Sequence, residues 1–158
     1  VEDVSMALVR FANGAMGSIV NSALSPRQET YMRFDYQRAT LELTHLYGYT
    51  RENWKLTPVP SAEDESLLQT WQSFPPDVGS SHGAQLNALV ADRDAGRRPL
   101  TSGDEARKTL ELLTAIYKSA FTGESVTRGS IRPGDPFYAA LHGNRAPSRK
   151  KGQRPEIG

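Results

Sequence analysis

The chain contains no cysteine, and its apolar residues never form a long run. Without cysteine, a disulfide framework, a thiolate zinc site and a cysteine nucleophile are all excluded. No stretch approaches the roughly 18 consecutive apolar residues that a membrane span needs. The N-terminus also lacks the charged-then-apolar layout of a signal peptide. We therefore expect a soluble protein with no membrane partner, most simply a cytoplasmic one.

Histidine and net charge are scarce as well. The three histidines, His45, His82 and His142, are far apart, and none has the spacing of a His-Glu-x-x-His metal motif. The formal net charge is +1, and residues 145–158 hold five Lys or Arg against one Glu, which leaves −3 for residues 1–144. A nucleic-acid surface needs basic residues gathered on the folded part. We therefore expect neither a metal site nor a nucleic-acid partner.

Signature motifs of catalysis and nucleotide binding are missing too. The segment Gly14-Ala-Met-Gly17 is only a partial glycine motif, and it lies in an expected hairpin instead of between a strand and a helix. No Walker loop and no Gly-x-Ser-x-Gly elbow is present. The sequence thus assigns no catalytic, cofactor-binding or metal-binding residue within this chain.

What is present begins with strands. Asn13-Gly14 separates two alternating runs, 4–11 and 15–24, and predicts a hairpin with a two-residue type I′ turn in which Phe11 faces Met16. Further strands are expected at 30–35, 39–45 and 53–59, with short ones at 67–74 and 123–128. The Pro58–Glu65 segment should be a surface loop.

Helices follow the strands. One is expected from His82 to about Gly96, and the clearest spans 102–123, where Ser102 and Glu105 fit a capping box and Gly123 suits a left-handed C-cap. Its expected apolar face consists of Ala106, Leu110, Leu113, Ile116, Tyr117 and Ala120. Strands first and helices later indicate α+β. We predict a mainly antiparallel open sheet of about six strands with helices packed on one face.

The domain organisation follows from composition. Residues 1–144 should form one domain, and residues 145–158 are too polar to offset the entropy of ordering them, so we expect a disordered basic tail.

The first hairpin should be apolar on both faces. In the expected register Phe11, Val9, Met16 and Val20 share one face, and Met6, Leu8 and Ile19 share the other. One helix layer can cover only one of them, and an exposed apolar patch usually marks an interface. We expect the open face to associate with a second copy or with a partner domain. The alternative is that later loops fold back over it.

One residue is a candidate for substrate binding. His82 follows the small residues Gly79, Ser80 and Ser81 at an expected helix start, where exposed backbone N–H groups favour polar ligands. Its imidazole would be suited to a substrate hydroxyl or to proton transfer. The alternative is a helix-end residue with a local hydrogen bond, because no second group that would orient a catalytic base is identifiable.

Several segments, in order, resemble the C-terminal domain of the Gfo/Idh/MocA oxidoreductases. They are Val1-Glu-Asp with Leu8-Val-Arg-Phe-Ala-Asn-Gly-Ala-Met-Gly-Ser-Ile, then Ala39-Thr-Leu-Glu-Leu, the His82 helix with Leu86 and Val90, and the run from Ser102 to Val126. The turn before Ala39 departs from the pattern, because Tyr36-Gln-Arg stands where the family commonly has glycines.

The resemblance implies a parent enzyme that transfers hydride between NAD or NADP and a sugar, polyol or related hydroxy compound. Its Rossmann domain and catalytic lysine, in a Glu-Lys-Pro motif, would precede this chain, which has no such motif. This chain would bind no cofactor itself and would be inactive alone. Its partners would be its own N-terminal Rossmann domain, a small-molecule substrate and further copies, through the sheet face. The alternative is a non-enzymatic interaction module with an open sheet face.

Overall fold

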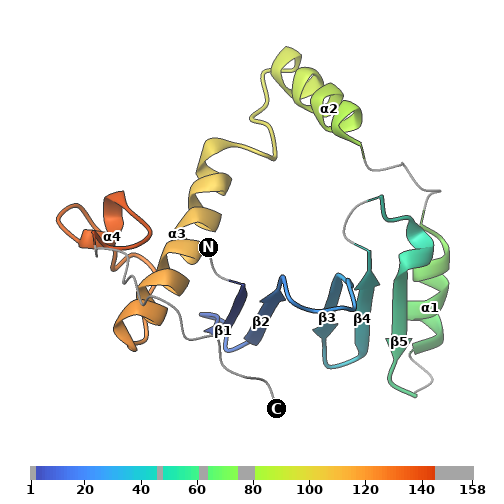
Figure 1. The fold of residues 1–158 in the computed structure, drawn as a ribbon. Coiled ribbons are helices and arrows are strands. Elements are labelled where there is room, and N and C mark those ends of the chain that lie inside the picture. The colour runs from blue at the N-terminus through green and yellow to red at the C-terminus, as the bar shows by residue number, and fades with distance from the viewer. Residues whose placement is uncertain (1–2, 46–47, 61–63, 75–80, 145–158) are drawn as a thin grey trace. The chain divides into compact units, whose positions relative to one another are not determined.

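A computed structural model describes residues 3–45, 48–60, 64–74 and 81–144. The chain divides into two compact units, Val1–Pro99 and Leu100–Gly158. The described part is α+β, with strands in the first unit and helices in both (Figure 1). It has two antiparallel sheets, of two and three strands, so the expectation of one sheet of about six strands is wrong. The expected tail, 145–158, lies outside the described residues.

The first sheet is the expected hairpin, of β1 (Val4–Arg10) and β2 (Met16–Ser22). Its predicted register is wrong by one residue, because Arg10, and not Phe11, pairs with Met16. The turn is longer than predicted: Gly14 N–H donates to Phe11 O (3.0 Å), and Phe11 N–H donates to Ala15 O (2.8 Å). Gly14 has a φ of 89°, which a three-residue connection with a bulge requires at this position.

The corrected register changes which side chains share a face. Met6 now lies opposite Val20, whereas the prediction placed Val20 with Phe11 and Val9. One face therefore collects most of the large apolar side chains of the hairpin, and we call it the hairpin apolar face. It comprises Val4, Met6, Leu8, Met16 and Val20, which are 49–83% exposed. The other face carries Ala7, Val9 and Ile19, which are half-buried.

The second sheet has the order β3 (Tyr31–Asp35), β4 (Ala39–Thr44) and β5 (Trp54–Pro58), as the sequence predicted for these three strands. A 3-10 turn, Arg51–Asn53, leads into β5. Alternation along the strands divides the sheet into an apolar and a polar face. Leu43 and Ala39, on the apolar face, are 4% and 6% exposed and lie in the core of this sheet.

Helix α1 (Asp64–Gln72) packs against β5 (Figure 1). The predicted strand at 67–74 is therefore wrong, and so is the loop prediction for the end of Pro58–Glu65. Leu67, Leu68 and Trp71 are half-buried at spacings of one and three, which is the helical period and not the period of two that a strand requires.

Arg51 fixes the C-terminal end of α1. Its guanidinium donates to the carbonyl oxygen of Trp71, in the last turn of the helix, and to that of Phe74 (2.9 Å), just beyond the helix end. Terminal carbonyls have no partner within a helix, so this cationic side chain supplies the hydrogen bonds and complements the negative helix end.

Helix α2 (His82–Asp94) confirms the helix expected at this position. Ser81 is its N-cap, and its side chain accepts a hydrogen bond from Ala84 N–H at 3.0 Å. Leu86, Leu89 and Val90 lie on one side of the helix and are 61%, 38% and 41% exposed.

The second unit is built on α3 (Gly103–Thr122), which confirms the longest predicted helix. Gly123, at φ 74°, is its left-handed C-cap as expected. The capping box does not form, because the Ser102 side chain makes no capping hydrogen bond and Glu105 pairs with Lys108. Leu110 is 55% exposed, so the expected apolar face is only partly buried in this structure.

The segment after α3 folds back along it. Residues 123–128 form no strand, contrary to the prediction, and lead to α4 (Pro136–Ala139). Phe137 is 5% exposed and packs on Phe121, with ring centroids 6.1 Å apart. The carboxylate of Asp135 caps α4 through Phe137 N–H (2.9 Å) and forms an ion pair with Lys118. These contacts make a small aromatic core between α3 and α4.

Candidate functional site

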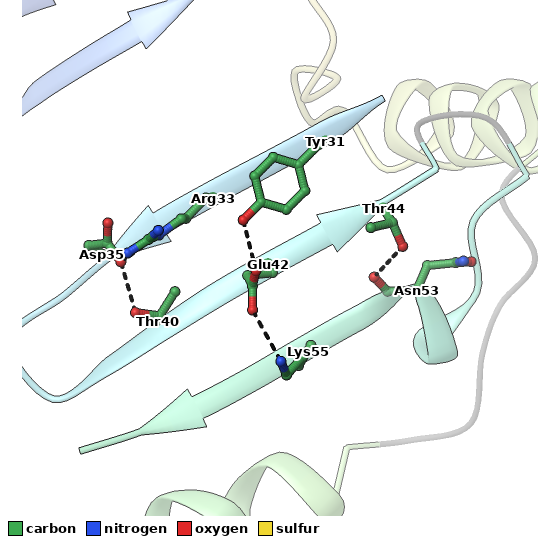
Figure 2. A network of polar contacts seen from close by, with 8 residues as sticks. All are labelled: Tyr31, Arg33, Asp35, Thr40, Glu42, Thr44, Asn53 and Lys55. Carbon is green, nitrogen blue, oxygen red and sulfur yellow. Dashed lines mark hydrogen bonds and ion pairs between the residues drawn. The ribbon is translucent and has the colours of Figure 1, made fainter. Parts of the chain in front are cut away.

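The polar face of the second sheet gathers most of the charged groups of its strands. The pairing aligns Arg33 with Glu42 and Glu42 with Lys55, so alternate residues of all three strands point to one side. We call this the polar sheet face, and Figure 2 shows its network. Its members are Tyr31, Arg33, Asp35, Thr40, Glu42, Thr44, Lys55 and Thr57.

Glu42 is the centre of one part of this network. Its carboxylate accepts a hydrogen bond from Tyr31 Oη at 2.7 Å and lies 3.6 Å from Lys55 Nζ (Figure 2). The Tyr31 hydrogen bond, and secondarily the positive charge of Lys55, lower the pKa of Glu42. The same hydrogen bond raises the pKa of Tyr31, because ionised Tyr31 would lose it and face a carboxylate.

Asp35 is the centre of the other part. Its Oδ1 accepts hydrogen bonds from Thr40 Oγ1 (2.8 Å) and Arg33 Nε (3.0 Å) (Figure 2). These two bonds lower the pKa of Asp35, with Thr40 the larger cause, and the bond to Asp35 raises the pKa of Arg33. The arrangement holds both carboxylates ionised and suits recognition of polar groups more than proton transfer near neutral pH.

An open cavity of about 520 Å³ lies where β2 connects to β3. We call it the connection cavity. Its polar lining consists of Ser22, Ser25, Arg27, Gln28, Glu29 and Thr30, and Val20 and Ala23 complete it. All of these residues come from one stretch of the first unit. Arg27 Nη2 and Glu29 Oε2 form an ion pair at 2.7 Å within the lining.

His82, the predicted substrate-binding residue, is the first residue of α2, as expected from the sequence. The residue is exposed, and its side chain makes no hydrogen bond or ion pair with any residue that the structure describes. Gly79 and Ser80, which were expected to favour a ligand beside it, lie outside the described residues. Its role in substrate binding stays a prediction.

Sequence reasoning missed both the polar sheet face and the connection cavity. For the polar sheet face, a period of two was a usable signal. Polar residues alternate with apolar ones along both strands, namely Arg33 and Asp35 in β3 and Thr40, Glu42 and Thr44 in β4. No residue pattern predicts the cavity, because most of its lining lies in the irregular connection between β2 and β3.

Two further features were sought in the described ranges. Within them, no group of three or more His, Asp or Glu side chains is placed to hold a metal ion. No helix among the described elements is both long and apolar enough to cross a membrane. Comparisons with protein-family models, with curated proteins and with solved structures give no match.

Proposed function

We propose that this chain is the C-terminal substrate-binding and oligomerisation domain of an NAD(P)-dependent oxidoreductase of the Gfo/Idh/MocA type. The parent enzyme would act on a sugar, polyol or related hydroxy compound. Its Rossmann domain and catalytic lysine would be encoded upstream, and this chain alone would be inactive. The substrate would be bound together with that domain, with NAD or NADP held there.

The observation that carries the proposal is how little apolar surface these units bury by themselves. Within the described residues, the buried apolar side chains are Ala39, Leu43 and Phe137, which are 4–6% exposed. A self-sufficient domain of this length buries roughly 70% of its unfolded surface. Units that bury so few apolar side chains are suited to packing against another domain or another copy of the chain.

The type and order of the elements agree with the resemblance. The segments that carry it form the β1–β2 hairpin, strand β4, helix α2 and helix α3, in that order, although the end of the Ser102–Val126 run forms no strand. Within each of the two sheets the strands pair antiparallel, which is not the parallel βαβ arrangement that holds a dinucleotide. This supports placing the cofactor on a separate upstream domain.

A second copy of the chain is the occupant that we propose for the hairpin apolar face. Arg10 is the one charged residue among the β-strand residues on that side, and it lies at the end of β1, so two copies meet with little charge repulsion. Fully burying one such apolar side chain is worth about 1.5–3 kcal/mol. Five of them, now mostly exposed, provide a substantial gain for an isologous contact.

Nicotinamide titration tests the placement of the cofactor. Reduced NAD and NADP, followed by fluorescence, should show no binding to this chain, whereas the whole gene product should bind one of them. The gene immediately upstream should encode a Gly-x-Gly-x-x-Gly strand-turn-helix and a Glu-Lys-Pro. Micromolar binding to the isolated chain, or a start codon directly at Val1, would count against the proposal.

Sedimentation tests the association surface. Leu8→Asp puts a charge in the middle of the hairpin apolar face, where Leu8 is 83% exposed, and should weaken self-association at least 100-fold. Leu100→Asp is the matched control, because Leu100 is 87% exposed but lies outside the hairpin. A monomeric parent chain, or equal effects of the two variants, would disprove self-association through this face.

The competing candidate is a non-enzymatic protein-interaction module. The exposed hairpin apolar face favours it as much as it favours oligomerisation. The two differ in the whole gene product: an interaction module predicts no nicotinamide binding by any length of this protein.

A further inference from the structure

We infer that the tip of the first hairpin is a site of spontaneous covalent modification. There Asn13 is converted to aspartate and isoaspartate through attack by the backbone nitrogen of Gly14. The inference is independent of the proposed function, because it needs only the geometry of this turn and water as the co-reactant. Asparagine is among the thermolabile residues, and this turn leaves one of them open to the reaction.

The reaction joins two atoms of neighbouring residues. The Gly14 nitrogen forms a bond to Cγ of Asn13, its proton leaves with the side-chain amide as ammonia, and a cyclic succinimide remains. Water then opens the ring. Cleavage of the new bond from nitrogen to Cγ gives aspartate with a normal backbone, whereas cleavage of the original peptide bond gives isoaspartate, whose backbone runs through Cγ.

Gly14 presents an unobstructed nucleophile. It carries no Cβ that would shield its nitrogen, and nothing lies within 4 Å of the position that a Cβ would take. Residues 11–16 are all exposed. Solvent can therefore remove the proton and open the ring.

The side chain of Asn13 is held by its oxygen. Oδ1 accepts a hydrogen bond from Ala15 N–H at 3.1 Å, which folds the amide back along the main chain of the next residue. This bond also draws electron density from Cγ. Within the described residues, the amide nitrogen of Asn13 makes no hydrogen bond, so no protein group retains the leaving ammonia.

One hydrogen bond opposes the reaction. Gly14 N–H donates to Phe11 O at 3.0 Å, so the nucleophile must first be released from the turn. Release costs little, because in the described part of the chain β1 and β2 pair only with each other, and a two-stranded hairpin is marginally stable. Opening of the turn therefore limits the rate without preventing the reaction.

Asn21 is the matched internal control. It is also exposed and is also followed by a small residue, Ser22. Both residues lie within β2, where Ser22 pairs with Val4 and the Asn21 amide donates to Ser5 Oγ at 3.4 Å. Because Ser22 has a Cβ and lies in a paired strand, we expect Asn13 to react at least about fivefold faster than Asn21.

The test is incubation of the full chain in water enriched in heavy oxygen, at mildly alkaline pH, followed by tryptic digestion and fragmentation mass spectrometry. Cleavage after Arg10 and Arg27 leaves Asn13 and Asn21 on one peptide, so their rates are measured under identical conditions. We expect label at position 13, two products of equal mass that separate by chromatography, and a rate that increases with pH. Equal labelling of the two asparagines, or aspartate as the only product, would overturn the inference.

Two variants complete the test. Asn13→Gln keeps the amide on a longer side chain, which forms the ring less readily, so labelling at position 13 should fall at least about tenfold. Isoaspartate lengthens the connection between Arg10 and Met16, so the purified isoaspartate form should exchange its β1 and β2 amides at least about threefold faster than Asn13→Asp, which has the same charge and a normal backbone. Unchanged labelling in Asn13→Gln, or equal exchange of the two acidic forms, would contradict the assignment.

Discussion

Replacing Gly143 with alanine should destabilise the second unit strongly. Gly143 has a φ of 59°, in the left-handed region where a Cβ costs about 1–2 kcal/mol. A Cβ there would also lie 2.5 Å from Cζ of Phe137, whose ring is held in the aromatic core by Phe121. A rigid buried ring cannot move aside cheaply, and overpacking of this kind costs about 1–3 kcal/mol more.

Gly129→Ala is the matched control for this prediction. Gly129 also has a positive φ, 79°, but nothing lies within 4 Å of the position that its Cβ would take, so only the backbone cost of about 1–2 kcal/mol applies. Its N–H, which donates to Glu111, is retained in the alanine variant. The difference between the two variants isolates the clash with Phe137.

Native-state hydrogen exchange of the α3 amides is the assay. Both tryptophans, Trp54 and Trp71, lie in the first unit, so tryptophan fluorescence would not report on the second. The combined cost of about 2–5 kcal/mol should speed exchange roughly 30-fold or more in Gly143→Ala, against about 5- to 30-fold in the control. Equal acceleration in the two variants would refute the packing argument.

Three further substitutions test contacts of the first unit. Arg51→Met should destabilise that unit by about 1–3 kcal/mol in urea unfolding followed by tryptophan fluorescence, because the terminal carbonyls of α1 lose their donors. Thr40→Val should raise the pKa of Asp35 toward its ordinary value in an NMR titration, because Thr40 is the main cause of its depression. Tyr31→Phe should likewise raise the pKa of Glu42, by removing its shortest hydrogen bond.

The two carboxylates also set the sign of a pH effect. The folded pKa values of Asp35 and Glu42 lie below their unfolded ones, so their contribution to stability is fully present above about pH 4–5. It is lost as the pH falls through the folded values. Two results would contradict the network of Figure 2. One is a stability that increases as the pH falls through this range. The other is an unchanged pKa of Asp35 in Thr40→Val and of Glu42 in Tyr31→Phe.

Elements with several agreeing local signals could be predicted from the sequence. Helix α3 combines a long apolar period with Gly123, and the strands β3 to β5 alternate clearly, so their positions are confirmed. The first hairpin was found because Asn13-Gly14 marks a turn. Its register was not, because the turn is one residue longer than predicted. Asn13 Oδ1 accepts a hydrogen bond from Ala15 N–H (3.1 Å) within this longer turn.

Where packing decides the structure, sequence reasoning failed. The run from Leu67 to Phe74 is apolar enough for a strand. In the structure its first part is helical and contacts β5. Its end accepts hydrogen bonds from Arg51, which lies twenty or more residues earlier in the chain. Residues 123–128 have strand-like composition, but Glu111 accepts a hydrogen bond from Gly129 N–H and ties this segment to α3. Such long-range contacts are not visible as a periodic pattern in the local sequence.

The most direct test of the account is hydride transfer by the whole gene product. Incubated with NAD or NADP and a panel of sugars and polyols, it should generate reduced nicotinamide, whereas the 158-residue chain under the same conditions should generate none. No reduced nicotinamide from the whole gene product with any of these substrates, or turnover by the chain alone, would contradict the proposal that this chain is the substrate-binding and oligomerisation half of an oxidoreductase.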